Sequence, residues 1–306
     1  MTENQRGADP LNDAGAAAAR TVAPSDDRFL DSALRPHGPA ASAARARRFG
    51  TWYIAEQVLR GMKGYLDVIV AYSIGNPLMY LFAMGIGLAS LVDSNTGAAA
   101  FGGVTYLQFI APSLLASAAM MTAAGEFTYP VMSGFKWRRT YYGPLASPIT
   151  PHQICQGHVL AVTIRLVLQS AVYLAIVLFF GAATSGWAWV TVFTATLAGL
   201  AFGIPLMAYA ASIKEDRGQF ALVQRFIVMP LFLFSGTFFP LSTLPWFLQW
   251  IGWISPVWHA TELGRVLSYG YPEPGWLTVV HVVFLAVLAA AGLVLARRIY
   301  AQRLEG

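Results

Sequence analysis

Long apolar stretches separated by short polar ones make up most of the chain, and this pattern predicts helices that cross a membrane. A spanning helix needs about 20 residues to cover about 30 Å of hydrocarbon. Six stretches reach that length, at about 66–90, 104–130, 155–180, 187–212, 220–239 and 276–298. We therefore expect an all-α polytopic membrane protein with six transmembrane helices, within residues 66–300.

A different pattern fills residues 45–65, directly before the first apolar stretch. Apolar side chains such as Trp52 recur there at helical spacing, and Arg60 and Lys63 are among the polar side chains between them. This predicts an amphipathic helix with basic flanks, of the kind that lies in an anionic membrane interface. A helix that packs on a partner protein would show the same pattern, and the two interpretations are compatible.

The first 44 residues carry too few apolar side chains to fold. They are rich in Ala, Pro, Asp and Arg and nearly free of aromatic residues, so burial cannot offset the entropy lost on ordering. We expect a disordered cytoplasmic tail. No basic and then apolar leader ending in small residues begins the chain, and we expect no secretory signal peptide.

Composition agrees with a membrane protein and argues against a nucleic acid partner. Hydrophobic residues make up 56% of the 306 positions and charged residues 11%, whereas soluble domains carry roughly 25% charged residues. The net charge is +5; residues 1–44 hold four Arg and six acidic residues, a balance of −2, which leaves +7 on the rest. Those basic residues gather at the ends of apolar stretches, not in a stripe with aromatic residues.

Basic residues are also divided unequally between the two sides of the predicted membrane. Most of them precede the first span, follow the sixth, or lie in the connections after the second and fourth spans, and the opposite connections hold only Arg265. Positively charged loops stay in the cytoplasm, so we expect both termini there. Arg165 and Arg225 fall inside spans near their cytoplasmic ends, where a long side chain can reach the interface.

The stretch between the fifth and sixth spans is broken by prolines. Residues 241–265 read LSTLPWFLQWIGWISPVWHATELGR. Proline in a first turn, and Pro256 in the middle, predict two short helices hinged at Pro256, because the residue before a proline is excluded from helical geometry. We expect a re-entrant hairpin in the outer leaflet, where irregular backbone must be surrounded by protein or a water-filled cavity. A cap at the extracellular interface, where Trp is common, is the alternative.

The chain lacks a nucleotide-binding loop of its own. None of its three lysines follows a glycine, so no G-x-x-x-x-G-K-[ST] motif exists. His152, Cys155 and His158 are metal-binding types, but the third turns away from the first around a helix and no fourth ligand is near, so we expect structural histidines and no metal. Cys155 is the single cysteine, which excludes an intrachain disulfide.

Two acidic positions are candidates for chemistry. Glu126 lies within the second predicted span, and we expect a structural or coupling role with Arg138, Arg139 or Arg165 as its partner, with a proton relay as the alternative. Glu262 follows His259 by three residues, so the two could form an outward-facing acid/base pair or simply orient a helix.

Residues 136–153, KWRRTYYGPLASPITPHQ, combine basic, aromatic and proline residues in a cytoplasmic connection. A plain loop would be polar throughout, so the aromatic residues indicate docking to another protein.

Three segments resemble a known family. They are FIAPSLLASAAMMTAAGEFTYPV, TYYGPLASPITPHQICQGHVL and FLFSGTFFPLSTLPWFLQWIGWISPVWHATELGR. They resemble the membrane subunit of type 2 ATP-binding cassette exporters, in the branch that holds permeases for nodulation-factor lipo-oligosaccharides and daunorubicin-type drugs. The resemblance covers about residues 50–300. It implies a dimer of membrane subunits, homodimeric or with a close paralogue, in the inner membrane. Separate ATPase subunits would bind ATP and Mg, and the cargo would be an amphipathic lipid, lipo-oligosaccharide or drug.

The same resemblance implies roles for particular residues. Residues 132–152 would be the coupling element that enters the ATPase, through Lys136, Trp137, Arg138, Arg139, Tyr141, Tyr142 and Pro144. Residues 45–65 would be the connecting helix, with Trp52, Arg60 and Lys63, and Glu126 would match an acidic position above the coupling element. Residues 241–265 would close the outer gate, through Pro240, Pro245, Trp246, Trp250, Trp253, Pro256, His259 and Glu262. The alternatives are a membrane-embedded lipid-modifying enzyme that uses His259 and Glu262, and a proton-coupled carrier that acts alone.

Overall fold

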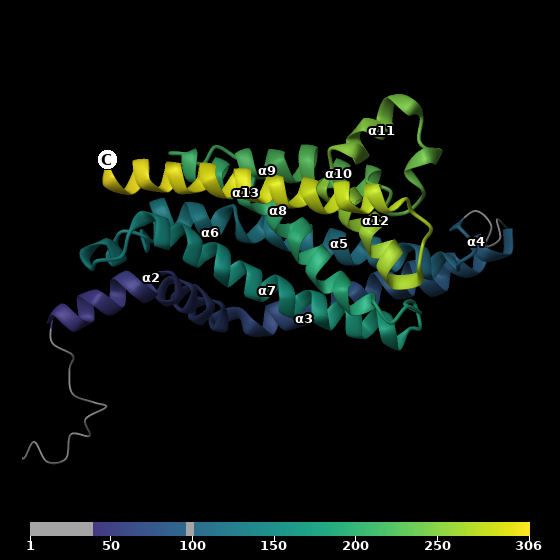
Figure 1. The fold of residues 1–306 in the computed structure, drawn as a ribbon, viewed down its shortest axis with the longest axis horizontal. Coiled ribbons are helices and arrows are strands. Elements are labelled where there is room, and N and C mark those ends of the chain that lie inside the picture. Colours follow the sequence, from purple (N-terminus) through teal and green to yellow (C-terminus); the bar gives the residue numbers. More distant parts are fainter. Residues whose placement is uncertain (1–38, 96–100) are drawn as a thin grey trace, which may run out of the picture. The chain divides into compact units, whose positions relative to one another are not determined.

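The computed structural model describes residues 39–95 and 101–306, and every regular element in that part is a helix (Figure 1). The first are α2 (Pro39–Met62), a 3-10 turn (Lys63–Tyr65), α3 (Leu66–Tyr80), a π-helical stretch (Leu81–Leu88) and α4 (Ala89–Asn95). Next come α5 (Tyr106–Glu126), α6 (Tyr129–Met132), α7 (Pro151–Phe179) and α8 (Thr191–Ser212). The last are α9 (Gln219–Val223), α10 (Met229–Phe234), α11 (Trp246–Trp253), α12 (Pro256–Tyr269) and α13 (Gly275–Glu305). Of the predicted tail, residues 1–38 lie outside the described residues and 39–44 belong to α2.

Residues 43–306 form one compact unit, to which the rest of the description refers. The described residues of the chain contain five helical stretches that are long and apolar enough to cross a bilayer, which makes the chain a multi-pass membrane protein. They are Ala40–Gly85, Tyr106–Trp137, Pro151–Phe179, Ala188–Ser212 and Gly275–Glu305.

The fifth predicted span, residues 220–239, is shorter in the structure than the sequence pattern suggests. Its apolar helix is Gln219–Phe234, roughly 24 Å long at 1.5 Å per residue. The helix ends there because the backbone turns at Gly236, whose φ of 71° is left-handed and costs glycine little. A sixth crossing therefore stays a prediction.

Close contact fixes α2 against α7. A Cβ atom on Gly157 of α7 would lie 2.5 Å from the Cβ of Ile54 and 2.7 Å from the carbonyl oxygen of Thr51. The side chain of Gln153 adds a hydrogen bond from Nε2 to the carbonyl of Arg47, at 2.7 Å. Only glycine at position 157 permits this approach, so α2 is attached to α7 along one tight seam.

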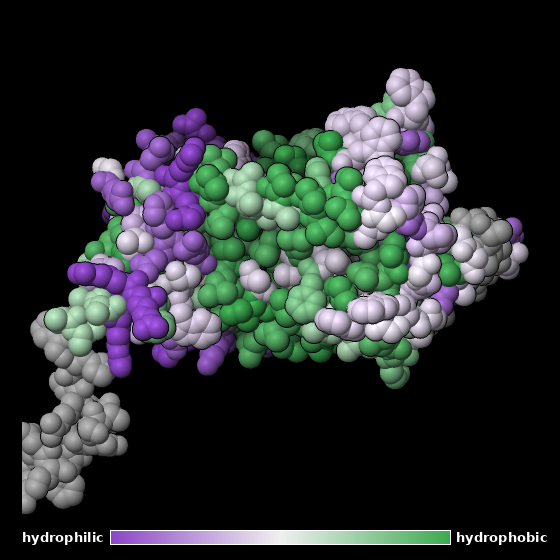
Figure 2. Space-filling model, viewed as in Figure 1, coloured by the Kyte–Doolittle hydropathy of each residue, from purple (hydrophilic) through white to green (hydrophobic). Residues whose placement is uncertain are grey.

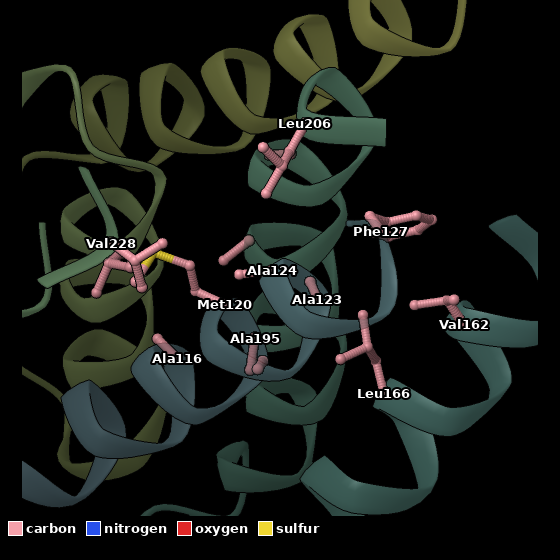
Figure 3. Close-up of a cluster of buried hydrophobic side chains, with 14 of the residues drawn as sticks. Ala116, Met120, Ala123, Ala124, Phe127, Val162, Leu166, Ala195, Leu206 and Val228 are labelled. Carbon is pink, nitrogen blue, oxygen red and sulfur yellow. The ribbon is translucent and has the colours of Figure 1, made fainter. Parts of the chain in front are cut away.

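Small residues also let α5 and α8 approach each other at the centre of the bundle. Figure 3 shows Ala116, Ala123 and Ala195 in this cluster of buried side chains. A Cβ on Gly199 of α8 would come 3.0 Å from the carbonyl oxygen of Ala119. Close backbone approach through small residues is the usual basis of helix packing in lipid, where burial of apolar side chains supplies no driving force.

Hydropathy divides the surface into zones along the helices. On the face shown in Figure 2, hydrophobic residues form a broad band around the middle of the molecule. Strongly hydrophilic residues gather at the end where α13 finishes, and residues of intermediate hydropathy cover the opposite end around α11 and α12 (Figures 1 and 2). The first of these is called the basic end below, and the second the hairpin end.

Candidate functional site

The predicted coupling element is a compact helical turn at the basic end. The π-helical stretch Ser133–Trp137 continues α6, and the amides of Arg138 and Arg139 both donate to the carbonyl of Ser133, at 2.9 and 3.2 Å. The chain reverses at Arg139, whose φ of 52° is left-handed. A 3-10 turn, Gly143–Ala146, follows.

One side of this turn forms an exposed basic and aromatic rim. Lys136, Trp137, Arg138 and Arg139 are exposed, and Tyr142 and Pro144 are partly buried. The guanidinium of Arg139 lies 4.9 Å from the ring centre of Tyr142. Among the described residues, none of the three basic side chains has an acidic partner within salt-bridge distance.

Tyr141 points the other way and is only 5% exposed. Its ring lies 5.0 Å from that of Phe135 and 5.4 Å from that of Tyr300 on α13, measured between centroids. Burial raises the pKa of the Tyr141 hydroxyl far above its ordinary value. The side chain is thus not available to a partner in this conformation, and it anchors the turn to the bundle.

Hydrogen bonds continue from Tyr141 to the end of α5. The Nε2 atom of buried His158 lies 3.1 Å from the carbonyl oxygen of Glu126. A carbonyl only accepts, so Nε2 carries the proton, and Nδ1 accepts from the hydroxyl of Tyr141 at 3.0 Å. The basic rim is therefore linked through Tyr141 and His158 to the second span.

The intramembrane acid has a partner on α7. Of the three arginines that the sequence offers, Arg165 is the one that pairs with the carboxylate of Glu126, and both side chains are largely buried. One turn further on, the hydroxyl of Thr122 donates to Oε1 of Gln169 at 3.0 Å. The arrangement is a paired charge between α5 and α7, which supports the structural or coupling interpretation over a proton relay.

Sequence reasoning missed the part that α13 plays at this end. Arg303 donates to the carbonyl of Ala211, and from Nη1 to that of Ile213 at 2.8 Å, and it lies 4.3 Å from the ring centre of Phe135. Tyr300, one turn earlier, is fully buried. In the sequence these residues look like an ordinary basic helix end, since nothing local reveals contacts across 90 residues.

The three residues singled out in the predicted connecting helix lie on its exposed side. Trp52 and Lys63 are exposed, and Arg60 pairs with Glu56 at 2.6 Å on the surface. Exposed pairs of this kind contribute at most about 1 kcal/mol, so this ion pair adds little to the stability of the helix.

At the hairpin end, the two short helices differ in burial. Trp246, Trp250 and Trp253 on α11 are all exposed. Helix α12 starts at Pro256, where the hydroxyl of Ser255 accepts from the amide of Val257 at 3.2 Å, and most of its residues are buried against α5, α8 and α13. Pro240 and Pro245 flank the 3-10 turn Leu241–Thr243 ahead of α11.

Arg265 is the main anchor of α12, a role that its place in a predicted extracellular connection does not reveal. It is 2% exposed, with its guanidinium 3.8 Å from the ring centre of Phe109. It donates to Glu262 at 2.7 Å, to the carbonyl of Gly236 at 2.6 Å and to the hydroxyl of Ser113 at 3.2 Å. One side chain thus joins α12 to α5 and to the turn after α10.

Glu262 is therefore occupied by Arg265, and His259 has other partners. Nε2 of His259 lies 3.0 Å from the carbonyl oxygen of Trp253, and Nδ1 lies 2.6 Å from Nδ1 of His281 on α13. Nε2 of His281 in turn contacts a carboxylate oxygen of Glu273 at 3.0 Å. Burial is the main cause that lowers the pKa of His259 to about 4.

The hydrogen-bond partners in this series determine where its protons lie. The Trp253 carbonyl requires a proton on Nε2 of His259, the Glu273 carboxylate requires one on Nε2 of His281, and one further proton lies between the two Nδ1 atoms. A proton on both Nδ1 atoms would set two donors face to face.

The described residues contain no group of three or more His, Cys, Asp or Glu side chains that could hold a metal ion. His152 is exposed, whereas Cys155 and His158 are buried.

Comparison with known proteins identifies the family. Residues 51–269 match the model of the ABC-2 type transporter family. The chain is 28% identical over 221 residues to Nodulation protein J of Rhizobium meliloti (strain 1021), which covers 70% of this chain and 80% of that protein. It is 26% identical over 253 residues to Nodulation protein J of Sinorhizobium fredii (strain NBRC 101917 / NGR234), covering 80% and 91%. It is also 30% identical over 170 residues to the probable multidrug ABC transporter permease YbhR of Escherichia coli (strain K12), covering 52% and 43%.

The family match spans more than half of the chain and includes the basic turn, the buried ion pair and the hairpin. The chain therefore belongs to the ABC-2 type transporter family, as the membrane subunit of an ABC exporter.

Proposed function

We propose that the chain crosses the inner membrane six times with both termini in the cytoplasm. It pairs with a second permease subunit and moves an amphipathic substrate from the cytoplasm or inner leaflet outward. Separate ATPase subunits supply the energy and bind ATP and Mg, since the sequence has no phosphate-binding loop. The division of basic residues supports the orientation.

The observation that carries this proposal is the two-sided build of the basic turn. Its outer side is the exposed rim of Lys136, Trp137, Arg138 and Arg139. Its inner side is Tyr141, which contacts His158 on α7 and Tyr300 on α13. Trp and Arg are enriched at the centres of protein interfaces, so the rim is suited to an ATPase subunit.

A push on this rim would reach the spans along the contacts of Tyr141. His158 bonds the end of α5, and Glu126 at that end pairs with Arg165 on α7. Helix α2 would move with α7, because Gly157 leaves no space between them. In this proposal α5, α7 and α2 form the lever that changes access to the substrate path.

At the other end, α12 would form part of the outer gate and the α11 tryptophans would rest in the outer membrane interface. Support comes from the burial of α12 against α5, α8 and α13, and from the exposure of Trp246, Trp250 and Trp253. The non-helical backbone at residues 235–240 is enclosed by protein at Ser235 and Thr237, which are both fully buried. Non-helical backbone inside a membrane must be surrounded by protein or by a water-filled cavity.

The docking proposal is tested by co-purification with the ATPase subunit. We expect Trp137→Ala to weaken the complex about 30-fold, the effect of about 2 kcal/mol at an interface hot spot. Trp189→Ala is the matched control, because Trp189 is similarly exposed, 55% against 51%, in the connection between α7 and α8. Unchanged affinity in Trp137→Ala, or equal loss in both variants, would refute docking at the rim.

Substrate class is tested with purified complex in vesicles. Candidate acylated oligosaccharides, lipids and amphipathic drugs are compared for stimulation of ATP hydrolysis and for ATP-dependent movement across the bilayer. We expect stimulation by at least one amphipathic class, and none by water-soluble sugars of the same head group. Stimulation by the soluble sugars alone would contradict the proposal.

A further inference from the structure

A groove of about 360 Å³ lies between the first helical stretch and α7. Leu66, Ile69 and Val70 of α3 line one wall, and Leu168 and Val172 of α7 line the other. The volume lies within the range of about 300–1,000 Å³ found for small-molecule sites. A helix about 10 Å across would not enter it, so its occupant must be slender.

The groove opens on the outer surface of the bundle. Val70 and Leu168, on opposite walls, are 47% and 63% exposed. Both belong to helical stretches that are apolar enough to cross a bilayer. The opening would therefore face lipid tails, which can enter sideways.

Positive charge gathers at one end of the groove. Lys63 and Arg165 both line it there, and Glu126 takes part of the charge of Arg165. Among the described residues Lys63 has no acidic partner within salt-bridge distance, and Nε of Arg165 has no hydrogen-bond partner. Asp67, one turn beyond Lys63, does not line the groove. Two cations against one carboxylate leave a net charge of +1.

The level of this charge fits a lipid head group. Glu126 ends α5, which begins at Tyr106, so the helix rises about 30 Å from one to the other, the thickness of the hydrocarbon. With Tyr106 at one boundary of the hydrocarbon, the ion pair with Arg165 would lie where the head groups of the other leaflet begin, and basic pockets between spanning helices are suited to anionic lipids.

We propose that this groove binds one anionic phospholipid of the bilayer, with an acyl chain between α3 and α7 and the phosphate at Lys63 and Arg165. The bound lipid would fill the space beside the 3-10 turn Lys63–Tyr65, where α2 gives way to α3. It would hold the angle between these two helices.

Native mass spectrometry tests this on the full chain, reconstituted in nanodiscs of dioleoylphosphatidylglycerol or dioleoylphosphatidylcholine and then released into detergent. We expect one retained phosphatidylglycerol per chain and at least tenfold less phosphatidylcholine. Leu168→Trp should lower retention at least fivefold by filling the groove. Leu295→Trp, on an exposed apolar face of α13 and 51% exposed, should retain lipid as the parent does.

Lys63→Glu is a second variant at an exposed position, and it should abolish the preference for phosphatidylglycerol while leaving the unfolding temperature unchanged. Equal retention of both lipids by the parent, or undiminished retention in Leu168→Trp, would overturn the proposal. So would a retained molecule from native membranes that is not a phospholipid, or a change of oligomeric state in Leu168→Trp, which would indicate a second copy in the groove.

Discussion

At both the basic end and the hairpin end, a short non-spanning segment is attached to the bundle, but the interactions that attach it differ. At the basic end the attachment is mainly aromatic, through Phe135, Tyr141 and Tyr300. At the hairpin end it is a buried cation, Arg265, together with a chain of histidines.

The exposed surfaces of the two ends differ in charge. The basic turn exposes a rim of charged side chains, whereas α11 exposes uncharged tryptophans. Aromatic packing falls off gradually with displacement, but a buried charge has discrete partners and tolerates little movement. The comparison indicates a turn that can shift in small steps and a hairpin that is either docked or released.

The largest effect is expected from Arg265→Met. Removing the cation leaves the Glu262 carboxylate and the Gly236 carbonyl without their partner, which typically costs about 3–5 kcal/mol. Thermal unfolding of the purified protein measures the loss. The double variant Arg265→Met with Glu262→Gln should recover part of it, and if the two losses simply add, the buried pair is not the cause.

Acid should loosen the hairpin end next. The folded pKa of His259 is about 4 against 6.5 ordinarily, so the unfolded chain binds the proton more readily. The contribution of His259 to stability is fully present above pH 6.5 and is lost as the pH falls toward 4. The loss is roughly 3 kcal/mol, at 1.36 kcal/mol per pH unit. The group that faces His259 is His281 on α13, which in turn contacts Glu273 just before that helix, while Glu262 on the helix of His259 is held by Arg265.

Hydrogen-exchange protection factors of residues 241–265 at pH 7 and pH 5, corrected for the pH dependence of the intrinsic exchange rate, measure this loosening. In His259→Gln the dependence should disappear. Protection factors that are the same at both pH values in the parent protein would show that His259 stays docked when charged.

A smaller loss is expected from Tyr141→Phe at the basic end. The ring packing stays, but Nδ1 of His158 loses its donor, at about 1–3 kcal/mol for a buried unsatisfied group. Unfolding midpoint and substrate-stimulated ATP hydrolysis are the two measurements, since stimulation reports on coupling. Tyr129→Phe, at an exposed tyrosine, is the control. Equal unfolding midpoints in the two variants would show that the Tyr141 hydroxyl does not stabilise the basic end.

The smallest effect should come from Arg139→Gly. Its left-handed φ of 52° is unfavourable for arginine, and glycine should gain up to about 1 kcal/mol in stability. The same change removes one charge from the rim, so affinity for the ATPase subunit should fall slightly as stability rises. A fall in both would show that the Arg139 side chain stabilises the turn, for example through Tyr142.

The sequence predicted what local pattern and composition determine. It predicted the all-helical class, five long apolar helices among its six expected spans, and the helix break before Pro256. It overestimated the helix of the fifth span, because the residues after Phe234 remain apolar although the backbone leaves the helix. Membership of the exporter family was readable from three short segments and is confirmed by the family match.

Long-range partners could not be predicted in this way. Arg265 and Ser113 are 152 positions apart, and Arg303 reaches Ala211 across 92. The pairing of Glu126 with Arg165 was one of three possibilities, and the burial of Tyr141 had no local signal. Such contacts depend on which helices become neighbours, and hydrophobic periodicity alone does not specify that.

The burial of Cys155 has a practical consequence. Its side chain is inaccessible, and it is the chain's single cysteine. A water-soluble maleimide should leave the parent protein unlabelled. One cysteine introduced at Trp250 or at Trp137 would then carry a spin or fluorescent probe in an otherwise unaltered chain, so movements of the hairpin and of the basic turn can be recorded separately.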